Sequence, residues 1–527
     1  MPAPQMQAPS SGVTVRMYRQ GHGDCFLLAT RDDSGQPFYL LIDCGLKPGS
    51  EIKATIEEVI ADIRDATGGH IHAVLVTHEH QDHTNMFIAK LGGKTMFDDI
   101  EFGEVLLGWT ANPEDTEAQQ LRQMKLKALM QLLAARRRLA GLAAEGVKDV
   151  QKTLNFVDAM LGFEGADADF LAALGPADGS LFGAARSAAV VAGLSVAKSM
   201  DYVTGKVDKP RYFSPHEPPF SLKGVSGVNV YPLGPPRDDR LNEDVPDASD
   251  AAGQARMYER TAPGHGLTFG FEGGLDGLFL GADPGFLGED AESHDPFAPG
   301  LKLVPGGSGW TGEIAAFFAH FALPEGEQWR SVNVEWLAAA GWFADKINTE
   351  LNNSSLVVAI ELTNSRKVLL FPGDAQYGSW MSWANTPFQV PAQGQAPTRT
   401  VTVKDLLART VFYKVGHHGS HNATLKGRAE SDYANLDWMA QGALAQEFVA
   451  VIPANTDWAM TKNDPPWEHP LKAIQDALKV KTRGRLFKSD TDFDLATPDG
   501  AVKADWQKFI ANVTATDLYF EYTVLDQ

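Results

Sequence analysis

The chain has 527 residues, of which 44% are hydrophobic and 21% are charged, and its formal net charge at pH 7 is -21. These values are typical of an ordinary globular protein, and they exclude extensive disorder and a broad basic surface that would coat nucleic acid. No segment approaches the roughly 20 uninterrupted apolar residues that span a bilayer, and residues 1–12 lack the pattern of a signal peptide. We therefore expect a cytoplasmic protein without membrane insertion.

Three apolar segments near the N-terminus predict an antiparallel meander of strands, at residues 13–18, 25–28 and 38–42. Two cysteines occur in the whole chain, and each directly follows an aspartate near the end of a predicted strand. Because such a pair forms no disulfide framework, we expect Cys25 and Cys44 to be free, buried thiols.

Apolar residues at spacings of three and four predict a helix that Ser50 caps and that Gly68 and Gly69 end. Residues 73–76 then predict a buried strand, and a polar cluster begins directly after it at His78. Ligands of α/β proteins commonly lie at the carboxyl ends of strands. The sequence therefore indicates a functional site at this point of the chain.

From about residue 115 to residue 205 the pattern is helical and rich in Ala, Leu, Arg and Lys. We interpret these residues as a helical insertion within one domain that spans residues 13–527. We expect the insertion to form a lid, or a surface for a protein partner or a second copy of the chain, and to lie outside the scaffold of the functional site.

The rest of the chain alternates strand-like and helical patterns, which predicts the α/β class. Strands are predicted at residues 228–233, 267–271, 278–280, 355–362, 367–371, 411–415 and 448–452. An acidic loop at 235–253, a glycine-rich loop at 281–308 and a helix at 334–351 are predicted between them.

Four side chains that can bind metal occur within six residues: His78, His80, Asp82 and His83. On a loop that leaves a strand they can surround two cations, with His78 and His80 facing one cation and Asp82 and His83 the other. Imidazole and carboxylate ligands suit zinc, manganese or iron.

Residues 78–83 resemble the His-x-His-x-Asp-His signature of the metallo-β-lactamase superfamily. The resemblance implies an αββα sandwich, in which two mixed β-sheets are flanked by helices, and a pair of divalent cations, zinc or alternatively manganese. It also implies that Asp43 orients the histidine loop and that Asp374, in the Gly-Asp step at residues 371–375, bridges the cations. Asp283 also follows an apolar strand, but it matches the pattern less well than Asp374.

The block Val-Gly-His-His-Gly-Ser at residues 415–420 resembles the last histidine motif of the superfamily. One of its histidines is implied to complete the ligands of the second cation. We favour His417, which is nearer the strand end, and expect His418 to support the ligands or to contact substrate. Asp82 and Asp374 are the residues expected to take part in catalysis, through the cations that they hold.

More narrowly, residues 21–24, 352–357, the Gly-Asp step and the histidine block together resemble the hydrolase domain of ComEC-like competence proteins, and phosphorylcholine esterases share parts of this pattern. The resemblance covers residues 13–110 and 205–490 and leaves the helical insertion unexplained. Because the membrane channel segments of competence proteins are absent from this sequence, it gives no support for DNA uptake.

This sequence departs from the superfamily pattern at the ligands of the first cation. Many superfamily members supply a further histidine where this chain has Asn352 and Asn353. The first cation then lacks one protein ligand, or an amide oxygen of one asparagine completes it, which suits manganese better than zinc. A plain turn or strand-start role for Asn353 is the alternative. Asp24 and His469 are expected to support the ligands or to contact substrate.

Together these features predict a binuclear metal-dependent hydrolase, with a phosphodiester as the leading substrate class and nucleic acid among the candidates. Two bridged cations would lower the pKa of a shared water to roughly 7 and so supply a bridging hydroxide for in-line attack. An acyl hydrolase that acts on lactones or β-lactams is the alternative. A non-catalytic partner or regulatory protein, in which metal only stabilises the fold, is an alternative of another class.

Overall fold

The computed structural model describes residues 5–144, 150–173, 192–215, 217–237, 351–383, 387–390, 398–420, 434–462, 466–498 and 501–527, together with single positions between 312 and 348. The predicted strands at 267–271 and 278–280, the glycine-rich loop at 281–308 and Asp283 lie outside the described residues, as do most of the predicted acidic loop and most of the predicted helix at 334–351. The described chain is a mixed α/β protein built on two large mixed sheets.

The first sheet has, in the described ranges, eight strands in the order β17-β18-β1-β2-β3-β4-β7-β8. Their bounds are β1 Gly12–Tyr18, β2 Cys25–Arg31, β3 Pro37–Cys44, β4 His70–Leu75, β7 Glu101–Gly108, β8 Arg211–Phe213, β17 Val513–Ala515 and β18 Tyr519–Leu525. The predicted antiparallel meander is confirmed, because β1 pairs with β2 and β2 with β3 in that sense. From β3 onward, β4, β7 and β8 are added in parallel.

The second sheet has the described order β16-β15-β14-β11-β10-β9. Its strands are β9 Val228–Pro232, β10 Val358–Leu362, β11 Val368–Phe371, β14 Thr410–Lys414, β15 Val449–Ile452 and β16 Leu486–Lys488. Strands β11, β14, β15 and β16 are parallel, which brings their carboxyl ends to one edge. Two small hairpins complete the described strands: β5 Lys90–Leu91 with β6 Lys94–Thr95, and β12 Pro387–Val390 with β13 Arg399–Thr402.

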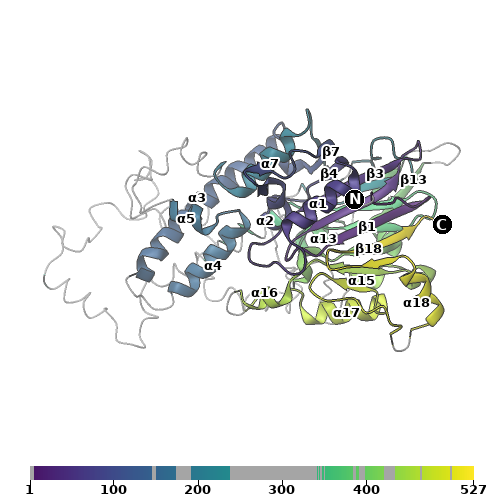
Figure 1. The fold of residues 1–527 in the computed structure, drawn as a ribbon. Coiled ribbons are helices and arrows are strands. Elements are labelled where there is room, and N and C mark those ends of the chain that lie inside the picture. Colours follow the sequence, from purple (N-terminus) through teal and green to yellow (C-terminus); the bar gives the residue numbers. More distant parts are fainter. Residues whose placement is uncertain are drawn as a thin grey trace.

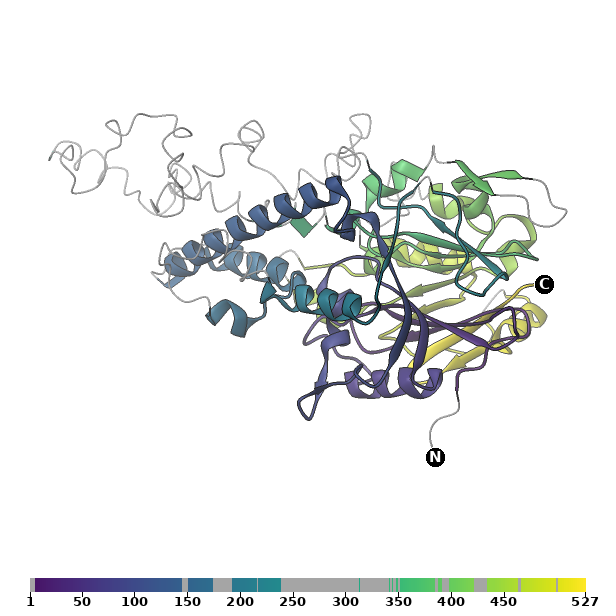
Figure 2. The same cartoon turned by 90° about the horizontal axis from the view of Figure 1, so that it is seen from above.

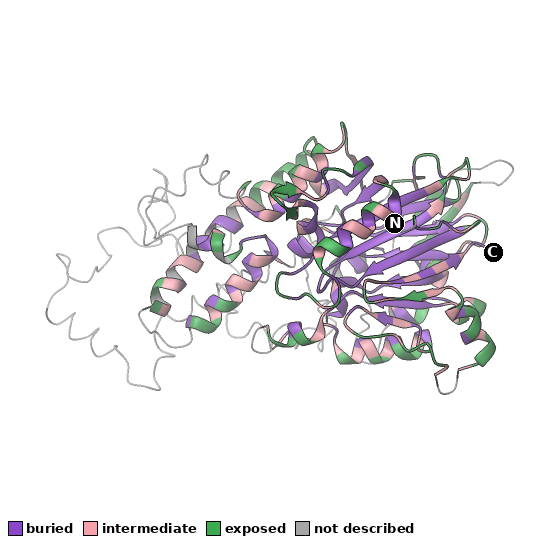
Figure 3. Cartoon of the chain, viewed as in Figure 1, coloured by how far each residue is buried: buried purple, intermediate pink, exposed green. Residues whose placement is uncertain are grey.

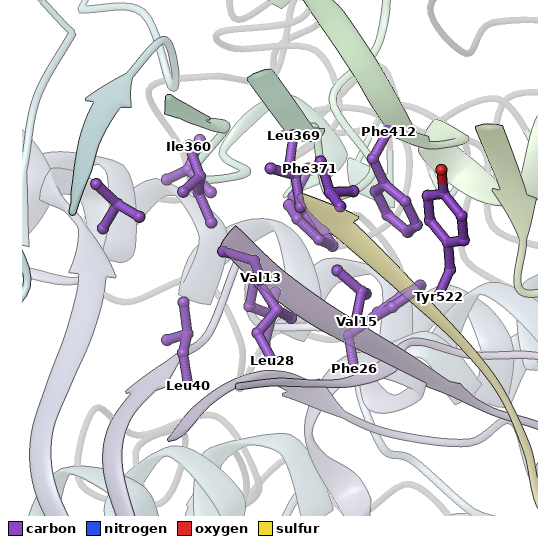
Figure 4. Packing of buried hydrophobic residues seen from close by; sticks show 14 of the residues in the cluster. Val13, Val15, Phe26, Leu28, Leu40, Ile360, Leu369, Phe371, Phe412 and Tyr522 are labelled. Carbon is purple, nitrogen blue, oxygen red and sulfur yellow. The ribbon is translucent and has the colours of Figure 1, made fainter. Parts of the chain in front are cut away.

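The two sheets pack face to face over the main hydrophobic core, which Figure 4 shows from close by. Val15 and Phe26 come from the first sheet, and Phe371 and Phe412 come from the second. The rings of Phe26 and Phe371 meet edge to face with centroids 5.7 Å apart. Each such fully buried side chain contributes about 1.5–3 kcal/mol through burial alone. Most strands of the two large sheets are accordingly buried over much of their length in the described residues (Figure 3).

Helices cover the outer side of each sheet, where two further clusters of buried apolar residues lie. The first sheet is covered by α1 Ile56–Thr67 and by η1 Asn85–Ile88. The second sheet is covered by α13 Tyr377–Trp383, α14 Val403–Ala408, α15 Ala434–Trp438 and α17 Lys472–Thr482. The other described helical segments outside residues 115–205 are α2 Gln81–Thr84, η2 Trp109–Ala111, η8 Gly416–Gly419, η9 Gly442–Gln446, α16 Thr456–Met460 and α18 Lys503–Ile510.

The start of α1 differs from the sequence prediction. Thr55, and not Ser50, is the N-cap, and it forms a capping box with Glu58. Ser50 is buried instead, where its hydroxyl accepts a hydrogen bond from the backbone N–H of His22 and donates one to Lys47 O. The predicted end is confirmed, because Gly68 takes the left-handed conformation that closes the helix.

The helical pattern at residues 115–205 is confirmed where the chain is described, as α3 Thr116–Ala144, α4 Val150–Phe163, α5 Ala168–Ala173 and α7 Ser195–Gly205. These helices connect β7 to its parallel neighbour β8 and project from one end of the sheets (Figures 1 and 2). Buried apolar residues of α3 and α4 form a separate cluster between them. None of the helices in the described ranges has both the length and the apolar character needed to cross a membrane.

Candidate metal centre

Five strands from both sheets end beside one another and place polar residues there. Asp43 is the second-last residue of β3, the histidine loop follows β4, and Asp374 follows β11. His417 and His418 follow β14, and the loop after β15 contacts His418. Because β3 with β4, and β11 with β14 and β15, are parallel, their carboxyl ends converge on a single buried centre.

Asp43 holds the start of the histidine loop. Its Oδ1 accepts a hydrogen bond from the backbone N–H of Thr77 at 2.7 Å, and its Oδ2 accepts from the Thr77 hydroxyl at 2.7 Å. The same Oδ2 lies 2.8 Å from Nδ1 of His83. This arrangement fixes the ring of His83 with Nε2 directed away from Asp43, which is the geometry expected of a carboxylate that orients a ligand.

Asp82, His83, Asp374 and His418 are brought together with one ligand atom of each within 4.8 Å of all the others. Nε2 of His83 lies 3.2 Å from Oδ2 of Asp374, and Nε2 of His418 lies 3.2 Å from Oδ2 of Asp82 and 3.5 Å from Oδ2 of Asp374. All four residues are buried. These separations match the spacing between ligand atoms around one cation with bonds of about 2.0–2.2 Å.

The structure places His418 in this group, whereas the sequence favoured His417. Both histidines have left-handed backbone angles, with φ 43° at His417 and φ 52° at His418, so the chain turns sharply after β14. His418 then points inward, with Nδ1 2.8 Å from the carbonyl oxygen of Pro453. His417 points to the side, with Nε2 3.3 Å from Nδ2 of Asn352 and Nδ1 2.7 Å from the Ser420 hydroxyl. Nearness to the strand end was therefore a poor guide to which ring faces the centre.

His78 and His80 form a second pair next to this group. Nε2 of His78 lies 2.9 Å from Nδ1 of His80, so these two ring nitrogens converge on one point between the rings. The ring of His78 also lies 4.2 Å from the ring of His83, which connects the pair to the first group. The predicted division of the loop into two half-sites is therefore consistent with these positions.

The two asparagines occupy different positions. Oδ1 of Asn353 accepts a hydrogen bond from the backbone N–H of Gln376 at 3.0 Å, which ties the start of β10 to the loop after Asp374. Asn352 faces His417, and its own Oδ1 is buried and has no hydrogen-bond partner. The geometry at Asn353 fits the structural alternative, and the free amide oxygen belongs to Asn352.

Lys414 is a member of this centre that the sequence reasoning missed. Its ammonium lies 2.5 Å from Oδ2 of Asp24 and 3.2 Å from Oδ1 of Asp374, and it donates to Gly373 O at 2.8 Å. Although burial lowers the pKa of Lys414, the charges of Asp24 and Asp374 raise it above its ordinary value. A lysine inside the apolar strand β14 was the available signal, because a buried ammonium needs carboxylate partners.

The charge distribution of the centre favours a cation. Burial raises the pKa of Asp82 and Asp374, but nearby histidines outweigh burial: His418 for Asp82, and His83 for Asp374, hold each pKa well below its ordinary value. Burial lowers the pKa of His83, but Asp374, Asp24 and Asp43 raise it well above its ordinary value. Without metal, the carboxylates therefore draw protons onto the histidines that face them.

Several buried atoms of the centre have no hydrogen-bond partner, namely Oδ1 of Asp82, Oδ1 of Asp24 and Nε2 of His83. Unpartnered buried polar atoms are unfavourable and need an explanation. The chemistry of imidazole and carboxylate donors fits divalent transition metals. The residues present therefore fit the predicted cations.

Three further histidines lie near the centre. Nδ1 of His469 is 3.5 Å from Nε2 of His22, and the ring of His469 is 5.5 Å from that of His417. His22 is fully buried, and burial together with the charge of His418 lowers its pKa well below the ordinary value. His417 and His469 are partly exposed. They form the side of the centre that solvent reaches.

The helical insertion also reaches the centre, which the sequence analysis did not expect. Glu164 directly follows α4, and its Oε1 lies 3.9 Å from Nε2 of His80. Lys125, in α3, lies 3.2 Å from Glu164 and 3.5 Å from Glu79. No spacing in the sequence connects these residues with the histidine loop, because packing alone brings them there.

A scan against models of protein families found no match for this chain, and a comparison with curated proteins found none either. The functional interpretation therefore depends on the geometry and chemistry of the centre.

Proposed function

We propose that this chain is a binuclear metal-dependent hydrolase whose substrate is a phosphodiester. The observation that carries the proposal is the buried group of Asp82, His83, Asp374 and His418, in which Oδ1 of Asp82 and Nε2 of His83 lack hydrogen-bond partners, next to the converging nitrogens of His78 and His80. A group of this composition has no evident use in a core stabilised by packing alone, because each unpartnered polar atom weakens the fold.

The arrangement of the chain supports the same proposal. Two mixed sheets packed face to face, with helices on both outer sides and the site at the carboxyl ends of their strands, agree with the αββα sandwich of the metallo-β-lactamase superfamily. We propose that fold for the domain. The order of the motifs along the chain, from the histidine loop through Asp374 to His418, agrees with it as well.

The formal charge of the centre is compatible with an anionic substrate once cations are bound. Asp24, Asp43, Asp82 and Asp374 carry four negative charges, and Lys414 carries one positive charge, which leaves -3. Two divalent cations would change this value to +1, and a hydroxide shared between them would return it to 0. Cations that cancel the negative charge remove the repulsion of a phosphodiester monoanion, whereas a neutral lactone gains nothing from this change.

When bound, a pair of divalent cations would supply a water that ionises near pH 7 and would offset the negative charge that develops on the leaving oxygen. The residues of the chain have the remaining tasks. Asp43 keeps Nε2 of His83 directed at Asp374, and Pro453 O keeps Nε2 of His418 directed at Asp82. Lys414 offsets the repulsion between Asp24 and Asp374. His417 and His469, on the solvent side, are placed to contact the substrate.

The test combines metal analysis with turnover. Purified protein should carry close to two transition-metal ions per chain and should cleave bis(p-nitrophenyl) phosphate in preference to a lactone and a cephalosporin. Preferred turnover of the lactone or cephalosporin would replace the phosphodiesterase with the acyl hydrolase. Metal-loaded protein that is inert toward all three would support the non-catalytic alternative.

A matched pair of histidine variants controls for unspecific effects. His83→Ala removes a buried member of the centre, while His70→Ala removes a partly exposed histidine at the start of β4. We expect His83→Ala to abolish turnover and to lower the metal content, and His70→Ala to leave both unchanged. Equal turnover in the two variants would contradict the proposed site.

A further inference from the structure

The helical insertion packs directly on the histidine loop. The ring of Phe163, the last residue of α4, lies 5.4 Å from the ring of His80. Glu164 follows it and is 4% exposed, although a carboxylate at that depth is costly unless it is paired. Lys125 provides the pairing from α3 at 3.2 Å. Two helices of the insertion therefore hold one buried carboxylate beside the candidate centre.

Three histidines of the centre share one arrangement of their ring nitrogens. Nδ1 of His83 lies 2.8 Å from Asp43, and Nδ1 of His418 lies 2.8 Å from Pro453 O. Nδ1 of His78 lies 3.1 Å from the hydroxyl of Thr77, which itself donates to Asp43 and therefore accepts from His78. In each ring the acceptor fixes the proton on Nδ1 and leaves the lone pair of Nε2 for the centre.

His80 is the exception, because its ring is turned the other way. Nδ1 faces Nε2 of His78 at 2.9 Å, so Nδ1 is the nitrogen directed at the centre. Nε2 points outward and is buried without a hydrogen-bond partner. Oε1 of Glu164 lies 3.9 Å from it, and this oxygen is also buried and without a hydrogen-bond partner.

We propose that Glu164 is the positioning residue for His80, so that the helical insertion sets how tightly the first half-site binds its cation. Glu164 accepts the proton of His80 Nε2 in a hydrogen bond, which leaves the lone pair of Nδ1 for the cation that His78 also faces. The present separation exceeds a hydrogen bond by about 1 Å, a gap that a small rotation of either side chain closes. The inference rests on the proposed function, because it assumes that His78 and His80 hold a metal ion.

The proposal also gives the insertion a role that the resemblance left unexplained. Lys125 lies between Glu164 and Glu79, and Glu79 is itself part of the histidine loop. A movement of α3 or α4 would therefore change the position of Glu164 relative to His80. The insertion is in this view a part of the metal centre rather than a separate lid.

The experiment is a zinc titration of the full-length, metal-free chain. Zinc binding is measured by calorimetry or by competition with a chromophoric chelator. Glu164→Met keeps most of the length of the side chain and removes the oxygens that can accept a hydrogen bond from His80, and Asp158→Asn, in α4 and paired with Arg136, is the control. We expect Glu164→Met to weaken one of two zinc equivalents by about 10- to 100-fold, the usual effect of losing a partner of a ligand histidine. The other equivalent, and both equivalents in Asp158→Asn, should be unchanged.

A double-mutant cycle separates positioning from a merely structural role. If Glu164 acts through His80, Glu164→Met adds no further loss of zinc affinity in a chain that already carries His80→Ala. Additive losses would overturn the inference. If Glu164→Met does not fold, as judged by circular dichroism, Glu164→Asp replaces it, because it keeps the charge beside Lys125 and withdraws the oxygen from His80.

The outcomes distinguish this inference from the proposed function. A wild-type chain that binds two zinc ions, with unchanged affinities in the Glu164 variant, would overturn the inference and leave the proposed function standing. A wild-type chain that binds no zinc would overturn both.

Discussion

Nε2 of His418 lies 3.2 Å from Oδ2 of Asp82, although 336 positions of sequence separate the two residues. His418 comes from the loop after β14 in the second sheet, and Asp82 from the loop after β4 in the first. The contact therefore joins the two sheets at the candidate centre. It also brings together a carboxylate and an imidazole that no local pattern could pair.

This contact predicts different effects for two adjacent histidines. His418→Ala should remove a ligand and release one of two zinc equivalents. Its loss of turnover should exceed the roughly 10- to 100-fold loss that is expected when a ligand keeps its place but loses its supporting partner. His417→Ala should keep both equivalents and change mainly KM, because His417 faces Asn352 and solvent. Metal analysis and steady-state kinetics of both variants check this, and a reversed order of effects would return His417 to the ligand set.

Asp374 should matter more than any single histidine. Its carboxylate lies next to His83, His418 and Lys414 at once, whereas His80 contributes one nitrogen to one half-site. Asp374→Ala should therefore abolish turnover and lower the metal content by more than His80→Ala does. Both variants are compared at fixed metal concentration, with folding checked by circular dichroism. A doubly metallated, active Asp374→Ala protein would contradict the bridging role.

From the burial of Lys47 we predict that the stability of the metal-free protein changes with pH. Burial lowers the pKa of Lys47 from 10.5 to about 7 in the fold, and its ammonium has no hydrogen-bond partner. Between pH 7 and 10.5 the unfolded chain binds the proton that the folded chain has lost, so the free energy of unfolding rises with pH through this window.

Lys47→Met removes this proton linkage. The variant should be more stable than the wild type by on the order of 2 kcal/mol at pH 7, and the difference should shrink towards pH 10. Urea unfolding of both metal-free proteins at several pH values measures it. Lys198→Met, at an exposed position of α7, is the control and should show no such trend. A gain that stays constant with pH would show that the ammonium is not desolvated.

Glu361 in β10 predicts a large structural effect away from the centre. Its carboxylate is buried and lies within 2.6–2.7 Å of Arg409 and Arg399, and it accepts a hydrogen bond from Tyr231 at 2.8 Å. Glu361→Gln leaves the arginines without their counter-charge and should cost about 3–5 kcal/mol of unfolding free energy. Asp476→Asn, in the exposed pair with Lys472, is the control and should leave the free energy of unfolding nearly unchanged.

The pH dependence of the destabilisation by Glu361→Gln follows from the pKa of Glu361. Burial raises the pKa of Glu361, but the charges of Arg409 and Arg399 and the hydrogen bond from Tyr231 lower it below its ordinary value of 4.5. The carboxylate therefore stabilises the fold above pH 4.5, and this contribution is lost as the pH falls through the lower, folded-state pKa. The difference in unfolding free energy between the wild type and Glu361→Gln should be largest near pH 7 and should decrease in acid. Equal stability of the two proteins at pH 7 would contradict the role of the pair.

Local pattern was sufficient for much of the fold. Alternating and continuous apolar segments predicted β1 to β4, β9, β11, β14 and β15 to within a few residues, because a strand buried on both faces leaves an apolar run in the sequence. The same reasoning did not predict that β18 pairs with β1 at the other end of the chain. It also placed the cap of α1 at Ser50, since a serine that caps a helix and a serine that is buried in a loop look alike in sequence.

What the sequence determined by itself is the set of residues that a local motif contains: His78, His80, Asp82 and His83 on one loop, and Asp374 after its own strand. Only the tertiary structure decided which of His417 and His418 faces them, that Lys414 lies between Asp24 and Asp374, and that Glu164 of the helical insertion reaches His80. The physical reason is that a motif fixes spacing along one short segment, whereas ring direction and the meeting of distant segments depend on backbone angles and on the packing of two sheets and an insertion.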